Sequence, residues 1–223
     1  MSSRIEKTFK ELKLKGKSAF IPYITAGDPD IGLSQKILNA LPRGGADIIE
    51  IGMPFSDPMA DGPAIQQSSL RALSNGQDMK RTLSMVKEFR IQNDHTPIIL
   101  MGYYNPILQF GTENFLKECT LMEIDGLIVV DLPIEHGQEL SIPAKKAGID
   151  FINFITPTTS SERLQSIIKV SSGFLYYVSI AGITGTKAPE IKELEDMVNK
   201  IKKYTNIPIG VGFGIKDSDQ VKN

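Results

Sequence analysis

The feature that most constrains the fold is a recurring order of apolar strand, polar loop and helix. Short segments rich in Ile, Val and Leu recur along the chain, and Gly, Pro, Asp or Thr residues follow almost every one of them. Strands that are apolar on both faces are typical of parallel sheets covered by helices on both sides. The seven predicted strands are 19–25, 47–51, 97–101, 126–130, 149–155, 174–179 and 207–211.

Segments with helical periodicity fill the intervals between these strands. The first helix contains Ile5, Phe9 and Leu12, and the second opens at Asp28 or Pro29. The motif 104–106, Tyr-Asn-Pro, is predicted as a turn. The other predicted helices are 63–74, 78–93, one from about residue 112, 135–147, 160–169 and 189–203.

Seven regular units exceed the five or six strands of a usual open sheet, and this favours a closed α/β architecture. We therefore predict a (β/α)₈ TIM barrel, in which loops at the carboxyl ends of the strands carry the functional residues. The chain ends at Asn223, a few residues into the seventh helix, and supplies no eighth βα unit. The expectation is one domain, residues 1–223, incomplete at its C-terminus. Either the chain is truncated or the barrel keeps an exposed edge.

Composition excludes several classes of function. The net charge of −1 provides no basic field for nucleic acid or an anionic membrane, and no apolar run reaches transmembrane length. Cys119 is the single cysteine, which suits a reducing compartment, and the N-terminus lacks the apolar core of a targeting peptide. His95 and His136 are isolated, so we expect no metal site. A soluble cytoplasmic protein is predicted.

Glu50 is the first candidate catalytic residue because it interrupts an apolar strand. Side chains alternate in a strand, so Ile48 and Glu50 share one face while Ile49 and Ile51 share the other. If both faces are covered, burial disfavours the ionised carboxylate and raises its pKa toward neutrality. Such a group works as a general acid or base near pH 7, although a lone Glu in a strand is more often structural.

Asp61 is the second candidate, eleven residues further along the chain on the loop that follows the same strand. This loop can fold back and bring both carboxyl groups into one pocket, in different environments. Asp57 lies on the same loop, and a turn or helix-cap role is as plausible for it as a chemical one.

Two glycine-rich motifs follow the sixth and seventh strands, at 182–185 and 212–214. Their amides can approach a phosphate closely, although a single motif of this kind is usually a simple turn. Two on neighbouring late strands favour a phosphate site, because barrels bind phosphate there. Tyr103, Tyr104, Tyr176 and Tyr177 lie at strand ends, where stacking on a flat substrate and core packing are equally plausible.

At this point the motifs resemble those of one family, the tryptophan synthase α subunit. The longest match is 49–62, and the resemblance extends over the whole chain. The other matching motifs, in order, are 22–29, 101–106, 131–133, 182–185 and 212–214.

The resemblance implies a barrel enzyme that cleaves indole-3-glycerol phosphate to indole and glyceraldehyde 3-phosphate. It implies that Glu50 is the acid and base and that Asp61 binds the indole N–H. It further implies that this chain carries no cofactor and joins a tryptophan synthase β subunit, which holds pyridoxal phosphate, in an α2β2 complex. The implied substrate-binding residues are Tyr23, Leu100, Ile128 and Phe213 around the indole, Tyr176 beside Glu50, Gly185 and Gly214 at the phosphate, and Thr184 on a closing loop.

Two departures from the family pattern affect these expectations. Ile180 stands where many relatives have a basic residue, and the remaining phosphate donors, a Gly-Ser pair, would lie beyond Asn223, so weak phosphate binding is expected. Two other functions stay open: a catalytically weak subunit that activates a β partner, and another phosphate-binding barrel enzyme of the pathway. The lack of a catalytic lysine within a strand weighs against the second.

Overall fold

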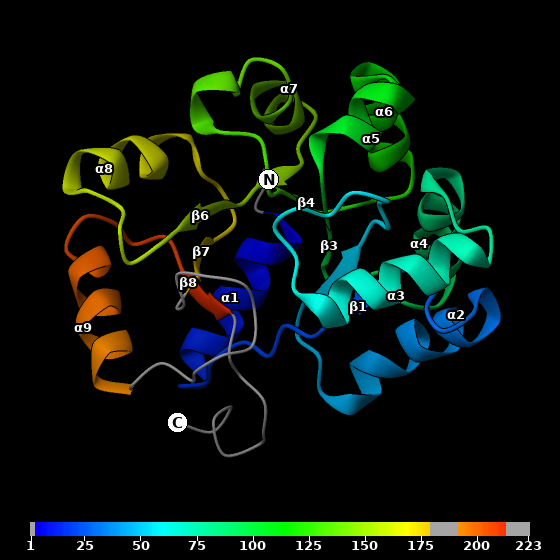
Figure 1. Ribbon diagram of the computed structural model, residues 1–223. Coiled ribbons are helices and arrows are strands. Elements are labelled where there is room, and N and C mark those ends of the chain that lie inside the picture. The colour runs from blue at the N-terminus through cyan, green and yellow to red at the C-terminus, as the bar shows by residue number, and fades with distance from the viewer. Residues whose placement is uncertain (1–2, 179–190, 213–223) are drawn as a thin grey trace.

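A computed structural model describes residues 3–178 and 191–212 and forms a barrel of parallel strands with helices outside it (Figure 1). The strands are β1 Tyr23–Thr25, β2 Ile49–Gly52, β3 Ile98–Gly102, β4 Gly126–Val129, β5 Asp150–Phe151, β6 Asn153–Ile155, β7 Leu175–Val178 and β8 Ile209–Gly212. The helices are α1 Arg4–Leu14, α2 Ile31–Ala40, η1 Leu41–Gly44, α3 Pro63–Ser74, α4 Met79–Gln92, α5 Tyr104–Phe110, α6 Thr112–Leu121, η2 Ile134–His136, α7 Ser141–Lys146, α8 Ser161–Val170 and α9 Ile191–Lys202. The TIM-barrel prediction is confirmed.

Every pair of neighbouring strands is parallel, in the orders β1-β2-β3-β4-β5 and β6-β7-β8. β5 and β6 are two halves of the single strand predicted over 149–155. They meet at Ile152, whose N–H still donates to the carbonyl of Leu127 on β4, at 3.0 Å. From Asn153 onward the chain pairs with β7 instead. This change of partner curves the sheet, because the first half of the strand pairs with β4 and the second half pairs with β7.

The alternation predicted for β2 is observed. Ile48 packs inside the barrel with residues of β3, β4 and β7, whereas Ile49 and Ile51 pack outward against the helices. The inner cluster consists of Ile5, Ile48, Ile99, Met101, Ile128, Ile152 and Phe174. Glu50 shares the inward face with Ile48, so the fold places a carboxylate inside the barrel.

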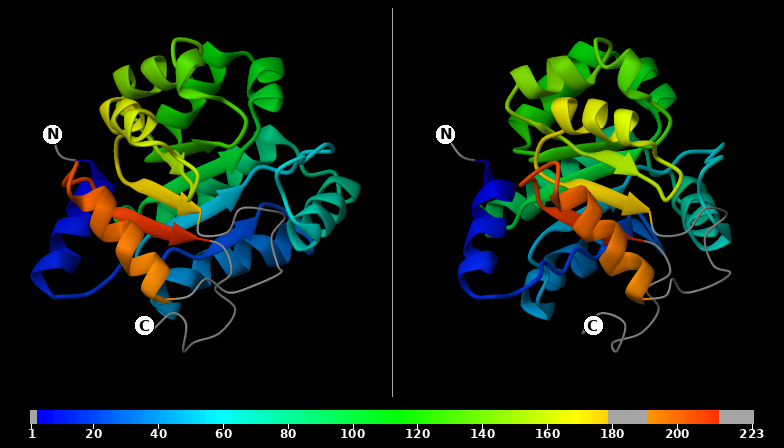
Figure 2. Two further views of the ribbon diagram at one scale, coloured as in Figure 1. Left: turned by 60° about the vertical axis from the view of Figure 1, so that its left-hand side comes forward. Right: turned by 90° about the vertical axis from the view of Figure 1, so that its left-hand side faces the viewer.

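Helix α1 covers the end of the barrel at which the strands begin (Figure 2). Ser3 caps this helix by accepting from the N–H of Glu6, and its hydroxyl donates to Asp150 at the start of β5, 2.8 Å away. The guanidinium of Arg4 contacts Asp125, which precedes β4. These contacts close one end of the barrel and leave the carboxyl ends of the strands for a site.

Three local predictions were wrong in detail. The motif 104–106 is not a turn but the first turn of α5, where Pro106 is tolerated because the N–H that it lacks would be unpaired there. Asp30, rather than Asp28 or Pro29, caps α2 by accepting from the N–H of Leu33. The helix predicted over 135–147 is divided into η2 and α7.

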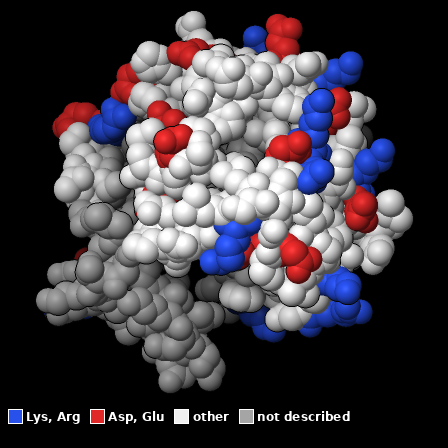
Figure 3. All heavy atoms as spheres, turned by 45° about the vertical axis from the view of Figure 1, so that its right-hand side comes forward, with Lys and Arg blue, Asp and Glu red and all other residues white. Residues whose placement is uncertain are grey.

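Charged side chains of both signs are interspersed on the face shown in Figure 3. Among the described residues, every helix is too short or too polar to cross a lipid bilayer.

Candidate active site

Glu50 lies on β2 inside the barrel and only 3% of it is exposed. It pairs in register with Tyr23 on β1 and with Ile99 on β3. Burial raises the pKa of its carboxyl to about 8, and the negative charge of Asp61 contributes to the same rise. Glu50 therefore holds a proton at neutral pH and can donate it.

Asp61 enters the same region from the loop between β2 and α3, directly before Gly62 and Pro63 start that helix. Its backbone N–H donates to the carbonyl of Pro58 at 3.0 Å, and Gln66 donates to its carbonyl at 2.9 Å. These bonds fix the end of the loop. Burial raises the pKa of Asp61, and a hydrogen bond from Tyr103 opposes that rise.

Tyr103, just after β3, connects this loop to the barrel, a role that the sequence did not reveal. Its hydroxyl donates to Oδ2 of Asp61 at 3.0 Å and accepts from the N–H of Ala60 at 2.9 Å. The ring of Phe55 packs on it, with centroids 5.4 Å apart. The only sequence signal was an aromatic residue at a strand end, which did not distinguish stacking on a substrate from anchoring of an acid.

Tyr23 on β1 and Tyr176 on β7 both lie close enough to Glu50 for its charge to act on them. Each ring lies over a glycine of the next strand, Gly52 for Tyr23 and Gly212 for Tyr176, and a β-carbon at either glycine would collide with the hydroxyl. Burial raises the pKa of both phenols, and the charge of Glu50 adds to the effect. Both tyrosines thus stay neutral beside the acid.

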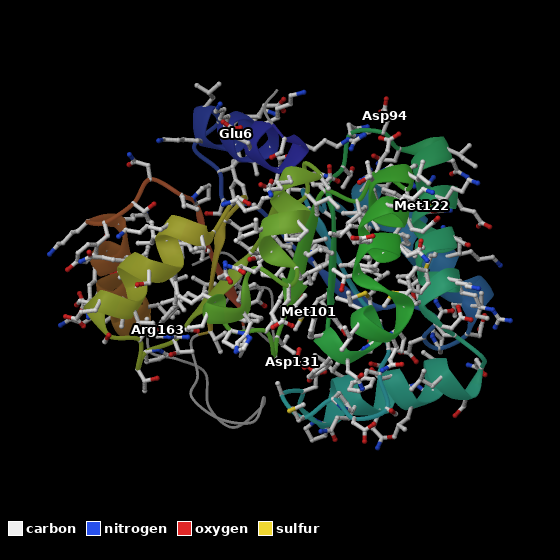
Figure 4. The ribbon with its side chains drawn as sticks, turned by 90° about the horizontal axis from the view of Figure 1, so that it is seen from above. Glu6, Asp94, Met101, Met122, Asp131 and Arg163 are labelled. Atoms are coloured by element: carbon white, nitrogen blue, oxygen red, sulfur yellow. The ribbon has the colours of Figure 1, made fainter. Side chains whose placement is uncertain are left out.

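Leu100 does not line the interior, contrary to the expectation for it. It packs outward with Ile98 against the helices, while its neighbour Met101 points inward. Ile128 does lie on the inner face, fully buried. Figure 4 labels Met101 and Asp131, which lie at the carboxyl ends of neighbouring strands.

A cavity of about 10 Å³, about the size of one water, separates the loop from the barrel mouth. Asp61 and Tyr103 contribute to its wall. The lining residues are Tyr23, Met53, Phe55, Pro58, Asp61, Ser69, Met101, Gly102, Tyr103 and Val130.

Four of the expected substrate-binding residues, Thr184, Gly185, Phe213 and Gly214, lie outside the described residues, as does Ile180. The proposed phosphate end of the site therefore stays a prediction.

Other candidate residues have structural contacts. Asp57 is exposed at the loop tip and accepts from Ser56, and Asp131 accepts from the N–H of Tyr104 at the start of α5, at 2.7 Å. Cys119 is buried, and burial raises its thiol pKa. Within residues 3–178 and 191–212, no group of three His, Cys, Asp or Glu side chains could hold a metal ion.

Comparison with known families gives one match over almost the whole chain. The family model described as "Tryptophan synthase alpha chain" matches residues 9–223.

Solved structures agree with this match. Tryptophan synthase subunit alpha from Legionella pneumophila is 42% identical with a TM-score of 0.89, over 97% of this chain and 80% of that one. A protein from Aquifex aeolicus is 34% identical with a TM-score of 0.92, over 99% and 84%. A chain of the tryptophan synthase α2β2 complex from Pyrococcus furiosus is 42% identical with a TM-score of 0.83, over 92% and 82%. From the family match over residues 9–223 and these solved relatives, the chain belongs to the tryptophan synthase alpha chain family.

Proposed function

We propose that Glu50 and Asp61 carry the reaction of this family in the present chain. The reaction is a carbon–carbon lyase step of tryptophan biosynthesis, the retro-aldol cleavage of indole-3-glycerol phosphate to indole and glyceraldehyde 3-phosphate. The observation that supports the assignment is the pair of carboxyl groups at the barrel mouth, one of them with a pKa of about 8.

Cleavage requires a proton on the indole carbon that bears the glycerol chain, because the indole must leave as a neutral molecule. Glu50 gives its proton to this carbon. The bond to the glycerol carbon then breaks and its electrons return to the ring. The hydroxyl on that glycerol carbon loses its proton to the Glu50 carboxylate and becomes the aldehyde of glyceraldehyde 3-phosphate. Glu50 ends the cycle protonated, as it began.

Protonation of the ring places positive charge on the indole nitrogen. Asp61, held by Tyr103, accepts a hydrogen bond from the indole N–H and stabilises that charge as it develops. Tyr23, Met101 and Ile128 surround the ring, with Met101 in the place first given to Leu100, and Tyr176 positions Glu50.

The test measures indole formation from indole-3-glycerol phosphate. Glu50→Gln should lower turnover by about a thousandfold and Asp61→Asn by about a hundredfold, because general acid catalysis and fixed charges contribute factors of this order. The matched control is Asp94→Asn, whose side chain is 91% exposed at the other end of the barrel and which should keep wild-type turnover. Near-wild-type turnover of Glu50→Gln would refute the assignment.

We also propose that the chain pairs with a tryptophan synthase β subunit, which would hold pyridoxal phosphate, in a cytoplasmic α2β2 complex. The α2β2 assembly of the Pyrococcus furiosus relative supports the pairing, and a single buried cysteine suits a reducing compartment. Size-exclusion chromatography of an equimolar mixture tests it, with a shared peak of the expected mass as the positive result. Separate elution would contradict it.

A further inference from the structure

Three hydroxyl groups form a hydrogen-bonded chain that runs from the site to helix α3. The Tyr23 hydroxyl lies 3.2 Å from Oγ1 of Thr25, and Oγ1 of Thr25 lies 2.7 Å from Oγ of Ser68. Ser68 donates in turn to the backbone carbonyl of Ile65 at 2.8 Å. Thr25 and Ser68 are 5% and 8% exposed, so these bonds are shielded from competing water.

The last acceptor fixes the direction of the whole chain. A carbonyl oxygen only accepts, so the single hydrogen of Ser68 points to Ile65. Ser68 must then accept from Thr25, which uses the hydrogen of Thr25. Thr25 in turn accepts from Tyr23. The hydrogen of the Tyr23 hydroxyl is therefore bound to Thr25 and not to a carboxyl group of the site, and its oxygen is left to accept.

Tyr23 is placed so that this direction affects the acids. It pairs in register with Glu50, its ring lies over Gly52 one step nearer the barrel mouth, and it lines the same cavity as Asp61. Among the described residues, the titratable groups near Glu50 are Tyr23 from β1, Asp61 from the β2–α3 loop and Tyr176 from β7, and Tyr103 reaches this region through Asp61. None of these is a cation. Within residues 3–178 and 191–212, the electrostatic influences on Glu50 are burial and the charge of Asp61.

We propose that Thr25 and Ser68 are positioning residues that hold the Tyr23 hydroxyl with its hydrogen turned away from Glu50, so that Glu50 stays in its acid form. The inference rests on the proposed role of Glu50 as proton donor and extends it to two residues that do not touch the reacting atoms.

Removing the Thr25 hydroxyl, which accepts from Tyr23, should change the direction in which the Tyr23 hydrogen points. In Thr25→Val, an isosteric change, the phenol hydrogen loses its partner and turns toward the two acids of the site, Asp61 and Glu50, whose charges both act on the Tyr23 phenol. A hydrogen bond to the charged form of a carboxyl stabilises that form and lowers its pKa. Glu50 would then lose its proton at a lower pH and the acid would be absent from a larger part of the pH range.

The experiment is the pH dependence of kcat/KM for indole formation in four proteins: wild type, Thr25→Val, Tyr23→Phe, and the double variant. We expect the alkaline limb of the Thr25→Val profile to move about one unit toward lower pH, so that turnover at pH 9 falls about tenfold and turnover at pH 6 is retained. In the Tyr23→Phe background the same substitution should cause no shift, because no hydroxyl is present to turn. Thr25→Ser, which keeps the oxygen, should match the wild type.

Ser68→Ala gives an independent readout if Thr25→Val does not fold. The hydrogen of Thr25 is then free to point at Tyr23, whose own hydrogen turns to the site, so a shift of the same sign is expected. An unchanged profile in both variants, or an equal shift in the presence and absence of the Tyr23 hydroxyl, would overturn the proposal.

Infrared titration of the Glu50 carboxyl, taken as the difference between each variant and the same variant with Glu50→Gln, separates the two levels of inference. It reports the pKa of this group without any turnover. If Glu50→Gln proves active, the proposed function fails, while the infrared shift still tests the hydroxyl chain. If Glu50→Gln is inactive and the infrared pKa does not move in Thr25→Val, only the chain fails.

Discussion

Buried acids lie at both ends of the barrel and have opposite surroundings. At the carboxyl end, Glu50 lies near another acid and two tyrosines, and no cation of the part of the chain that the structure describes contributes to its pKa. At the other end, Asp125 bonds to Arg90 at 2.6 Å, to Arg4 at 3.1 Å and to the N–H of Ile98 at 2.8 Å. Burial raises the pKa of both acids, but the arginines oppose the rise only for Asp125. At the carboxyl end the acid thus stays protonated and can serve in catalysis, whereas at the other end the ion pairs of the acid stabilise the fold.

The largest expected effect on stability tests the role of the paired end. Arg90→Met should destabilise the protein by about 4 kcal/mol, because it leaves the Asp125 carboxylate buried without its closest partner. Urea unfolding measures the change. The matched control is Arg163→Met, which removes an exposed ion pair with Glu135 and should change stability very little.

Turnover per folded molecule should be unaffected by Arg90→Met, since Arg90 lies at the far end of the barrel. A loss of activity as large as that of Glu50→Gln would erase the distinction between the two ends.

The second prediction concerns the carboxyl end of the barrel, where a substitution of Glu50 should stabilise the protein. Because folding raises the pKa of Glu50 from 4.5 to about 8, the native state binds the extra proton between these values and its stability falls as the pH rises through them. The penalty is absent below pH 4.5 and complete above pH 8. Glu50→Gln should therefore be more stable than the wild type at pH 9, by on the order of 3 kcal/mol.

Thermal unfolding of both proteins at pH 5 and pH 9 checks this second prediction. A gap in Tm that does not widen toward pH 9 would show that Glu50 is not protonated by the fold.

The third effect concerns how Asp61 is held. Tyr103→Phe removes the hydrogen bond that opposes the rise in the pKa of Asp61, so that pKa should rise further. The acid limb of the kcat/KM profile should then move to higher pH, and turnover should fall about tenfold, which matches the loss of one hydrogen bond to a charged group. A control is Tyr204→Phe, a tyrosine 44% exposed just after α9. If Tyr103→Phe behaves like this control, Asp61 is positioned by its loop alone.

The smallest effect returns to the closed end. Ser3→Ala removes the cap of α1 and the bond to Asp150, and should destabilise the protein by about 1 kcal/mol without a change in turnover. Urea unfolding resolves a difference of this size. Ser160→Ala, which removes the corresponding cap of α8, provides the comparison, because Ser160 caps by the same bond at a helix outside the barrel.

The sequence determined the order of the elements, because strand and helix periods and the Gly, Pro and Asp residues after the strands are local signals. It also determined that Glu50 shares a face of β2 with Ile48, since strand side chains alternate, and the structure shows that this face points inward. β3 contains no charged residue that would distinguish its two faces. Its residues from Ile98 to Met101 are all apolar, so only packing revealed that Met101, and not Leu100, points to the site.

Contacts between distant parts of the chain were decided by the tertiary structure alone. The bond from Tyr103 to Asp61 joins residues 42 apart in sequence, and the bond from Thr25 to Ser68 joins residues 43 apart. No local pattern encodes such pairs, because a hydroxyl group finds its partner only after the barrel has brought separate strands and loops together. The sequence therefore indicated which acid interrupts the apolar strand, and the folded barrel decided which neighbouring groups determine the pKa of that acid.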